Sequence, residues 1–256
     1  MSIIKENFIW IHIPKNAGWS IKETLRLGDG HLSIQEMKDL GHDSWGGLHE
    51  PGQGNGGCTP FRSTPYDGSL PVACFVRNPY DRLISAYYQR YYLDDIVHYD
   101  NSAPKVIPRP RGLKPCRPPT KETFEKFVLR VDSAEEAAIK FVDLNTVFKT
   151  QFSFVSIDDR LAATHIYRYE NLDEEYINFK NQFFPRFRGH CDKLPHLNKN
   201  PDRWEPAPSS RLTPGVRRNL RKEPWQSYYD NKKVKEKVDE LYRADFEAFD
   251  YPMEIR

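Results

Sequence analysis

The sequence predicts an α/β fold in which a mainly parallel central sheet is flanked by helices. Three apolar runs rich in β-branched and aromatic residues indicate buried strands, and segments with helical spacing come between and after them. Strands that alternate with helices favour parallel pairing. The 256 residues, 13% of them aromatic, can build one sizeable core, so we expect a single domain over residues 1–256.

The first predicted strand covers residues 8–13, and a Pro-Lys-Asn-Ala-Gly turn ends it. A short helix is expected over residues 18–27, where Ile21 and Leu25 fall four positions apart and glycines follow. Residues 41–68 are rich in glycine, whose backbone entropy disfavours regular structure. We therefore expect a loop excursion there.

The second predicted strand covers residues 70–76, and Pro79 suits the first turn of the helix that should follow. Residues 96–119 are rich in proline and basic side chains, which predicts a second loop excursion. Helical spacing returns over residues 124–131, and residues 164–169 form the third predicted strand. The last expected element is a helix with an apolar stripe made of Val234, Val238, Leu241 and Tyr242.

Charge and hydropathy exclude several classes of partner. Lys plus Arg (38) nearly balance Asp plus Glu (36), so no global field attracts nucleic acid or a membrane surface. No run approaches the roughly 20 apolar residues that span a bilayer, and no signal-peptide pattern opens the chain. We expect a cytoplasmic protein with no nucleic-acid or membrane partner, whose anion sites are local.

The four cysteines show no paired Cys-x-x-Cys spacing, so we expect no metal site. Cys74 falls inside the second predicted strand, where a free cysteine acts as a small buried apolar residue. A disulfide between Cys116 and Cys191 stays open, although reduced thiols fit a cytoplasmic chain better.

A phosphate-binding turn is expected after the first strand. Residues 14–20 combine a turn, a glycine that permits close backbone approach, a helix N-terminus, a lysine and a hydroxyl. The Gly-x-x-x-x-Gly-Lys-Ser/Thr pattern of ordinary ATPases and GTPases occurs nowhere in the chain.

A second candidate segment follows the second strand. Arg77 ends that strand, and Ser85 lies eight positions later, about two helical turns on. Arginine offers a forked donor matched to phosphate, and serine adds a hydroxyl. Because ligands bind at the carboxyl ends of parallel strands, both segments should face one crevice.

The two segments together resemble a known family. His-Ile-Pro-Lys-Asn-Ala-Gly-Trp-Ser at residues 12–20 resembles the 5′-phosphosulfate loop of sulfotransferases that use 3′-phosphoadenosine 5′-phosphosulfate (PAPS). Its usual form there is close to His-Ile-Pro-Lys-Thr-Ala-Gly-Thr-Ser. The segment Val-Arg-Asn-Pro-Tyr-Asp-Arg-Leu-Ile-Ser from residue 76 resembles their 3′-phosphate segment. The branch most similar is the carbohydrate sulfotransferases related to heparan sulfate 2-O-sulfotransferase.

This resemblance implies a P-loop-like sulfotransferase fold and an enzyme that moves a sulfuryl group from PAPS to a hydroxyl of a carbohydrate or other small polyol, leaving 3′,5′-ADP. It implies that Arg77 and Ser85 hold the 3′-phosphate, and that Lys15 stabilises the reacting 5′-phosphosulfate. Trp19 replaces the usual threonine and removes a hydroxyl from the loop. The backbone amides implied to bind the 5′-phosphosulfate are those of Asn16, Ala17, Gly18, Trp19 and Ser20.

A hydroxyl acceptor must lose its proton, and histidine is the side chain best suited to take it near neutral pH. The family branch places this base between the two PAPS segments, which favours His49 and leaves His42 or Glu50 as alternatives. His12, at the end of the first strand, is interpreted as a structural histidine bonded to backbone.

Other functions stay open. The chain could be a small-molecule natural-product sulfotransferase, or a non-catalytic module that binds PAPS or 3′,5′-ADP without turnover. The basic excursion at 96–119 could bind an anionic acceptor or simply face water. Arg82 is expected to be a surface charge and is left outside the site.

Overall fold

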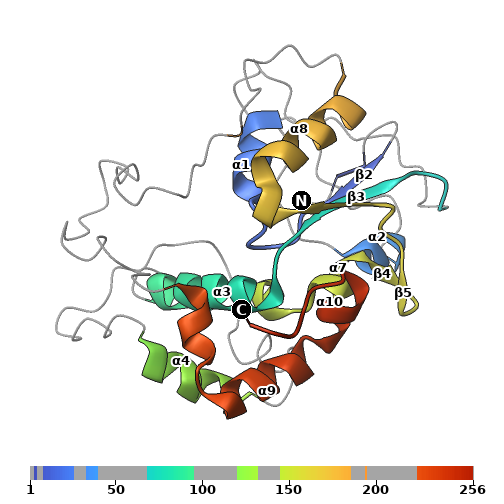
Figure 1. Ribbon diagram of the computed structural model, residues 1–256. Coiled ribbons are helices and arrows are strands. Elements are labelled where there is room, and N and C mark those ends of the chain that lie inside the picture. Colours follow the sequence, from blue (N-terminus) through green and yellow to red (C-terminus); the bar gives the residue numbers. More distant parts are fainter. Residues whose placement is uncertain are drawn as a thin grey trace. The chain divides into compact units, whose positions relative to one another are not determined.

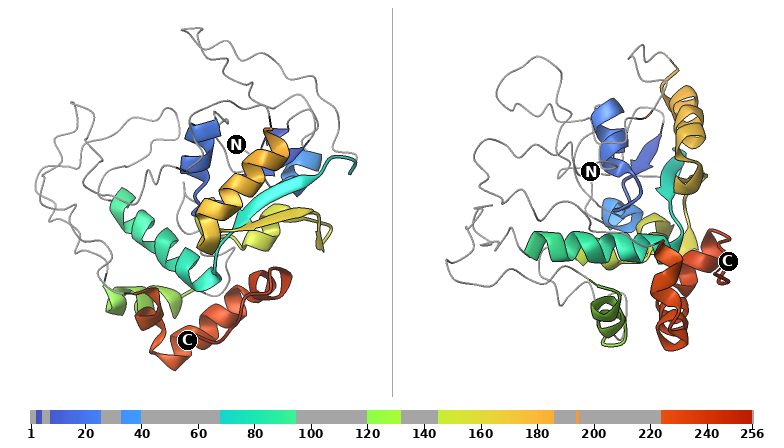
Figure 2. Two further views of the ribbon diagram at one scale, coloured as in Figure 1. Left: turned by 45° about the horizontal axis from the view of Figure 1, so that its top comes forward. Right: turned by 60° about the vertical axis from the view of Figure 1, so that its left-hand side comes forward.

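The computed structural model describes residues 3–4, 8–25, 33–39, 68–94, 120–131, 145–185, 194 and 224–255. The chain forms two compact units. The first unit consists of Met1–Arg77 and Thr150–Lys199, and the second consists of Asn78–Lys149 and Asn200–Arg256. Figure 1 shows the elements of both, and Figure 2 gives two further views.

A four-stranded sheet forms the centre of the first unit, with the order β1-β2-β3-β6. β2 pairs in parallel with β3, and β3 with β6, while β1 joins the edge antiparallel. The α/β fold with a mainly parallel sheet is therefore confirmed. The strands are β1 (Ile3–Ile4), β2 (Ile9–Ile11), β3 (Val72–Val76) and β6 (His165–Arg168).

One face of this sheet is covered by α1 (Gly18–Leu25) and α8 (Leu172–Phe183). Because side chains alternate along a strand, Trp10 and Phe75 point to this face from neighbouring strands. The aromatic rings are in direct contact, as in the stacked pair of Phe75 and Tyr167, whose centroids lie 5.1 Å apart. The helices contribute Ile21, Leu25, Leu172, Tyr176, Phe179 and Phe183 to the same buried cluster.

The strands also bury their other face. Ile9, Ile11 and Cys74 are fully buried, and α7 contacts β3. The prediction that Cys74 is a buried residue of a strand is confirmed. The remaining elements of this unit are α2 (Ile34–Asp39), α7 (Gln151–Val155), the hairpin β4 (Ser156–Ile157) and β5 (Arg160–Leu161), and the 3₁₀ helix η2 (Tyr169–Asn171).

The second unit is helical in its described part and has an aromatic core. Tyr80 is fully buried, and its ring lies 4.7 Å from that of Tyr229 and 4.9 Å from that of Phe246, centroid to centroid. Its elements are α3 (Pro79–Asp94), α4 (Lys121–Val128), α6 (Asn145–Phe148), the 3₁₀ helix η4 (Trp225–Tyr229), α9 (Lys232–Leu241) and α10 (Arg243–Ala248).

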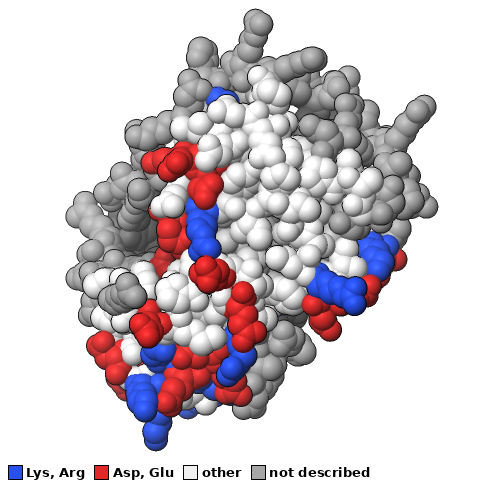
Figure 3. Space-filling view, turned by 45° about the vertical axis from the view of Figure 1, so that its right-hand side comes forward, with Lys and Arg blue, Asp and Glu red and all other residues white. Residues whose placement is uncertain are grey.

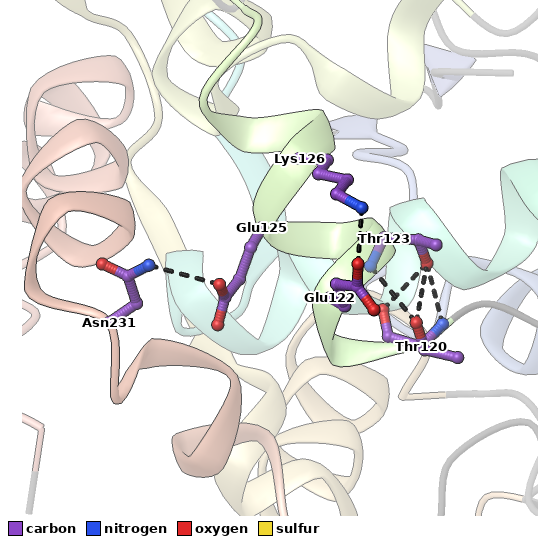
Figure 4. Close-up of polar contacts among 6 residues, drawn as sticks. All are labelled: Thr120, Glu122, Thr123, Glu125, Lys126 and Asn231. Atoms are coloured by element: carbon purple, nitrogen blue, oxygen red, sulfur yellow. Dashed lines mark hydrogen bonds and ion pairs between the residues drawn. The ribbon is translucent and has the colours of Figure 1, made fainter.

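Polar contacts fix the start of α4, as Figure 4 shows. The Thr120 hydroxyl accepts a hydrogen bond from the amide of Thr123 at 3.2 Å, and the Thr123 hydroxyl accepts one from the amide of Thr120 at 2.8 Å. This reciprocal capping box satisfies amides that the helix itself cannot. Farther along α4, Glu125 accepts a hydrogen bond from the Asn231 side chain at 3.2 Å, which joins α4 to the start of α9.

All three predicted strands and the predicted helices at residues 18–27, after Pro79, near 124–131 and near 234–242 are present, with shifted bounds. The excursion at 96–119 lies outside the described residues, as does the one at 41–68 apart from Gly68. Cys116 and Cys191 also lie outside them. Within the described ranges, no helix combines the length and the apolar character needed to cross a bilayer.

Candidate functional site

The loop between β2 and α1 has a backbone suited to anions. Lys15 and Ala17 both adopt positive φ values, 74° and 60°, although neither is glycine. Such left-handed residues each cost roughly 1–3 kcal/mol, so the surrounding contacts must hold them in place. Left-handed residues within a turn direct successive amides inward and form an anion-binding concavity.

The start of α1 adds to this loop. The carbonyl of Ala17 accepts the first helical hydrogen bond, from the amide of Ile21 at 3.1 Å. The amides of the first turn lie at the positive end of the helix dipole, which favours an anion beside them. These are the amides of Gly18, Trp19 and Ser20, three of the predicted binding residues. The side chain of Trp19 lies outside what the structure describes.

Gly18 is packed against an aromatic ring. A Cβ atom at this position would lie 1.7 Å from His12 Nε2, so a side chain cannot fit without a shift. The His12 ring is itself 8% exposed and stacks on Trp10, with centroids 5.2 Å apart and planes inclined by 8°. This geometry suits a structural histidine. Its bond to backbone stays a prediction.

The loop is tied directly to the end of β3. The side-chain amide of Asn16 donates to the carbonyl of Phe75 at 2.7 Å, and Arg77 Nη1 donates to the carbonyl of Lys15 at 3.0 Å. The structure therefore brings together the two segments that the strand order had placed at one edge of the sheet. Asn16 is 1% exposed, and its side-chain amide is engaged inside the protein.

Arg77 is held between the loop and an aromatic ring. Its guanidinium carbon lies 4.1 Å from the centroid of the Tyr169 ring, and the residue is 7% exposed. Stacking and the bond to Lys15 fix the plane of the guanidinium. A guanidinium carries five N–H donors, and the bond to Lys15 engages one of them.

A glutamine that the sequence analysis missed joins these parts. Gln151 is fully buried, and its side chain hydrogen-bonds both to Asn16 and to the backbone of Arg77. No local pattern marks this residue, because its partners lie 74 and 135 positions away in the sequence. A sequence signal for the start of α7 is Thr150, a residue type that often caps helices. Its hydroxyl accepts a hydrogen bond from the amide of Ser153 and so fixes the start of α7.

Ser85 and Arg82 both lie on α3, in the second unit. Ser85 is half-buried in the second turn of the helix. The expectation that Arg82 is a surface charge is wrong, because this residue is 1% exposed. Its guanidinium donates to the carbonyls of Lys149 at 2.9 Å and Val147 at 3.2 Å, which offsets the cost of burying the charge.

The three candidate bases, His49, His42 and Glu50, lie outside the described residues. Figure 3 shows basic and acidic side chains interspersed on one face of the molecule, in keeping with the net charge of +2. An anion site in this chain must therefore be formed by local hydrogen-bond donors and positive charges. Among the described residues, the Lys15 loop and Arg77 are candidates.

One family model, described as the sulfotransferase family, matches residues 4–252. The match begins in β1 and ends beyond α10, so it covers described elements of both units. Comparison with curated proteins gave no match, and comparison with solved structures gave none.

Proposed function

Because this chain belongs to the sulfotransferase family and so catalyses sulfuryl transfer, we propose that its donor is PAPS and that its acceptor is a hydroxyl of a carbohydrate or other small polyol. The donor assignment depends mainly on one observation, the hydrogen bond from Arg77 to Lys15. PAPS carries anionic groups on both sides of its ribose. A site for it needs two sets of anion donors close together, and the contact between the loop and Arg77 supports such a site.

In this proposal the 5′-phosphosulfate is bound by Lys15 and by the backbone amides of residues 16–20. Arg77 binds the 3′-phosphate together with Ser85. The burial and stacking of Arg77 support its part, because a guanidinium fixed in advance loses little freedom when an anion binds. The prediction of a single domain over residues 1–256 also stays part of this proposal.

PAPS, when bound, supplies an activated sulfuryl group. Sulfuryl transfer resembles phosphoryl transfer in leaving negative charge on the departing oxygen. The Lys15 ammonium and the first amides of α1 would stabilise this charge, and the strained loop would hold them in place before the reaction begins. We propose that this chemistry needs no metal and that His49 takes the proton of the acceptor hydroxyl.

The donor can be tested by calorimetry with 3′,5′-ADP and ATP. We expect 3′,5′-ADP to bind more tightly, because only it carries the 3′-phosphate that Arg77 and Ser85 would contact. Arg77→Ala should lower the affinity for 3′,5′-ADP by about tenfold to a hundredfold, the effect of losing a charge-assisted hydrogen bond.

Lys15→Ala should lower turnover more than donor affinity if its charge acts chiefly in the transition state.

Equal affinity for ATP and 3′,5′-ADP would refute the 3′-phosphate site. Lys38→Ala is a suitable control, since Lys38 is exposed and its ammonium is paired with Asp158. This variant should bind 3′,5′-ADP like the wild type.

The base can be tested once a screen with labelled PAPS has found an acceptor. His49→Ala should lower kcat by about 10²- to 10⁴-fold, the usual contribution of a general base, and leave 3′,5′-ADP binding nearly unchanged. The pH profile of kcat/KM should fall on the acid side, because a protonated imidazole cannot accept a proton. Near-normal turnover of His49→Ala beside an inactive His42→Ala or Glu50→Ala would move the role to that residue.

The same screen separates the alternatives for the acceptor. Turnover with sugars supports the proposal, whereas turnover only with aromatic or aliphatic alcohols would indicate a natural-product sulfotransferase. Binding of 3′,5′-ADP with no turnover on any acceptor would indicate a non-catalytic module.

A further inference from the structure

The Gln151 side chain makes three hydrogen bonds that meet at the Lys15 loop and the end of β3. Its Oε1 accepts from Asn16 Nδ2 at 2.7 Å and from the backbone amide of Arg77 at 2.9 Å. Its Nε2 donates to the backbone carbonyl of Arg77 at 2.8 Å. The residue is fully buried and begins α7, whose start Thr150 caps.

The donor and the acceptor of the Gln151 carboxamide explain these bonds. A carboxamide carries both a donor and an acceptor, so it can bond the N–H and the C=O of one residue, as a neighbouring strand does. Gln151 does this for Arg77, directly beyond the last residue of β3. The second lone pair of its oxygen accepts from Asn16, the residue between the left-handed Lys15 and Ala17. One side chain thus fixes the main chain of Arg77 and the middle of the loop.

β3 has a comparable contact at its other end. The Thr164 hydroxyl accepts from the amide of Val72 at 3.0 Å and donates to the carbonyl of Val72 at 3.3 Å. Val72 is the first residue of β3, at the opposite end from the loop and Arg77. Thr164 is exposed and contacts the same strand without touching either segment, which makes it a control for the loss of a side-chain contact with β3.

We propose that Gln151 is a positioning residue for the donor, holding the 5′-phosphosulfate loop and Arg77 in fixed register with one another. This inference rests on the proposed function and extends it to a residue outside both sequence motifs. Gln151 acts through Asn16 and Arg77, and no contact with the donor is needed for this role.

The main test replaces Gln151 by Met, which has a similar length but no amide. Calorimetry with 3′,5′-ADP, 5′-AMP and 3′-AMP then reports on both ends of the site. We expect Gln151→Met to lower the affinities for 5′-AMP and 3′-AMP alike, each by about tenfold or more. The reason is that buried polar groups of both the loop and Arg77 lose their hydrogen bonds. Thr164→Val should bind all three nucleotides like the wild type.

Asn16→Leu provides a second variant if Gln151→Met does not fold. It removes the Asn16 bonds to Gln151 and to the carbonyl of Phe75, and it leaves the Gln151 contacts with Arg77 in place. We expect it to lower the affinity for 5′-AMP by about tenfold more than the affinity for 3′-AMP. Equal weakening of both by Asn16→Leu, or normal binding of both by Gln151→Met, would overturn the inference.

Amide hydrogen exchange separates this inference from the proposed function. Gln151→Met should speed exchange in residues 15–18 and at Arg77 relative to Thr164→Val, whether or not a nucleotide binds. If the wild type binds none of the three nucleotides, the proposed donor is wrong, and exchange still shows whether Gln151 orders the loop. Equal exchange in the two variants would show that Gln151 has no such role.

Discussion

Gly18 is a residue at which one added methyl group should affect both stability and binding. Gly18→Ala would place a Cβ atom 1.7 Å from His12 Nε2. The His12 ring is buried and stacked on Trp10, so it has little room to turn aside. We expect the free energy of unfolding to fall by about 1–3 kcal/mol, as in other overpacked sites, and 3′,5′-ADP affinity to fall with it. Urea denaturation and calorimetry measure the two effects.

The double variant Gly18→Ala with His12→Ala removes the clash and serves as the control. It should bind 3′,5′-ADP more tightly than Gly18→Ala alone, because the loop can return to its position. An unchanged unfolding midpoint for Gly18→Ala would show that the loop accommodates the methyl group at no cost.

Individual residues show where sequence reasoning succeeds. Lys15 and Arg77 follow strands that are recognisable by their apolar runs, and parallel pairing then brings the two together. Arg82 and Gln151 could not be assigned in this way. The carbonyls that accept hydrogen bonds from the Arg82 guanidinium are 65 and 67 positions away in the sequence. The partners of Gln151 are 74 and 135 positions away. Such contacts are set by tertiary packing, which a local pattern does not encode.

At the scale of the element, the capping box of α4 permits a direct test. Thr120→Ala removes the hydroxyl that accepts from the Thr123 amide, shown in Figure 4. We expect the free energy of unfolding to fall by about 1 kcal/mol, the usual cost of losing a threonine cap. Thr120→Ser keeps the hydroxyl and should retain wild-type stability in the same urea titration. A Ser variant as unstable as the Ala variant would mean that the threonine methyl group, and not the cap, matters.

Element bounds were predictable only where the pattern was long. The apolar runs located β2, β3 and β6, whereas β1, β4 and β5 are two residues each and too short to show a period. The β4–β5 turn has positive φ at both Asp158 and Asp159, 49° and 57°, which is typical of a type I′ hairpin. Asp-Asp is a weaker signal for this turn than Asn-Gly or Asp-Gly, so the hairpin went unpredicted.

At the scale of the whole molecule, buried thiol and phenol groups should lower the free energy of unfolding at alkaline pH. Burial raises the pKa of Cys74 from 9.0 to about 12, and burial, with Glu175 and Cys74 nearby, raises the pKa of Tyr167 from 10.0 to about 12. In the second unit, burial and then Asp239 raise the pKa of Tyr80. In the alkaline range the unfolded chain loses these protons while the folded chain keeps them.

The stabilising contribution of these groups is therefore complete below pH 9 and is lost as the pH rises from 9 towards 12. For Cys74 alone the free energy of unfolding should fall by up to about 1.4 kcal/mol per pH unit within this range. Urea titrations from pH 7 to pH 11 measure the slope, and Cys74→Ala should reduce it. Equal slopes for the two proteins would show that the thiol does not contribute.

The route of the chain through the two units determines when the loop can become ordered. Synthesis delivers β2, the loop and β3 first, then all of Asn78–Lys149, and only then Gln151 and β6. Contacts that close such long segments form slowly, since chain entropy must be lost before they are gained. A nascent chain that ends before Thr150 lacks both β6, which is one of the two parallel partners of β3, and the amide that fixes Arg77. The loop should therefore reach its final shape late in folding, and the ability to bind a nucleotide should be among the last properties that the protein gains.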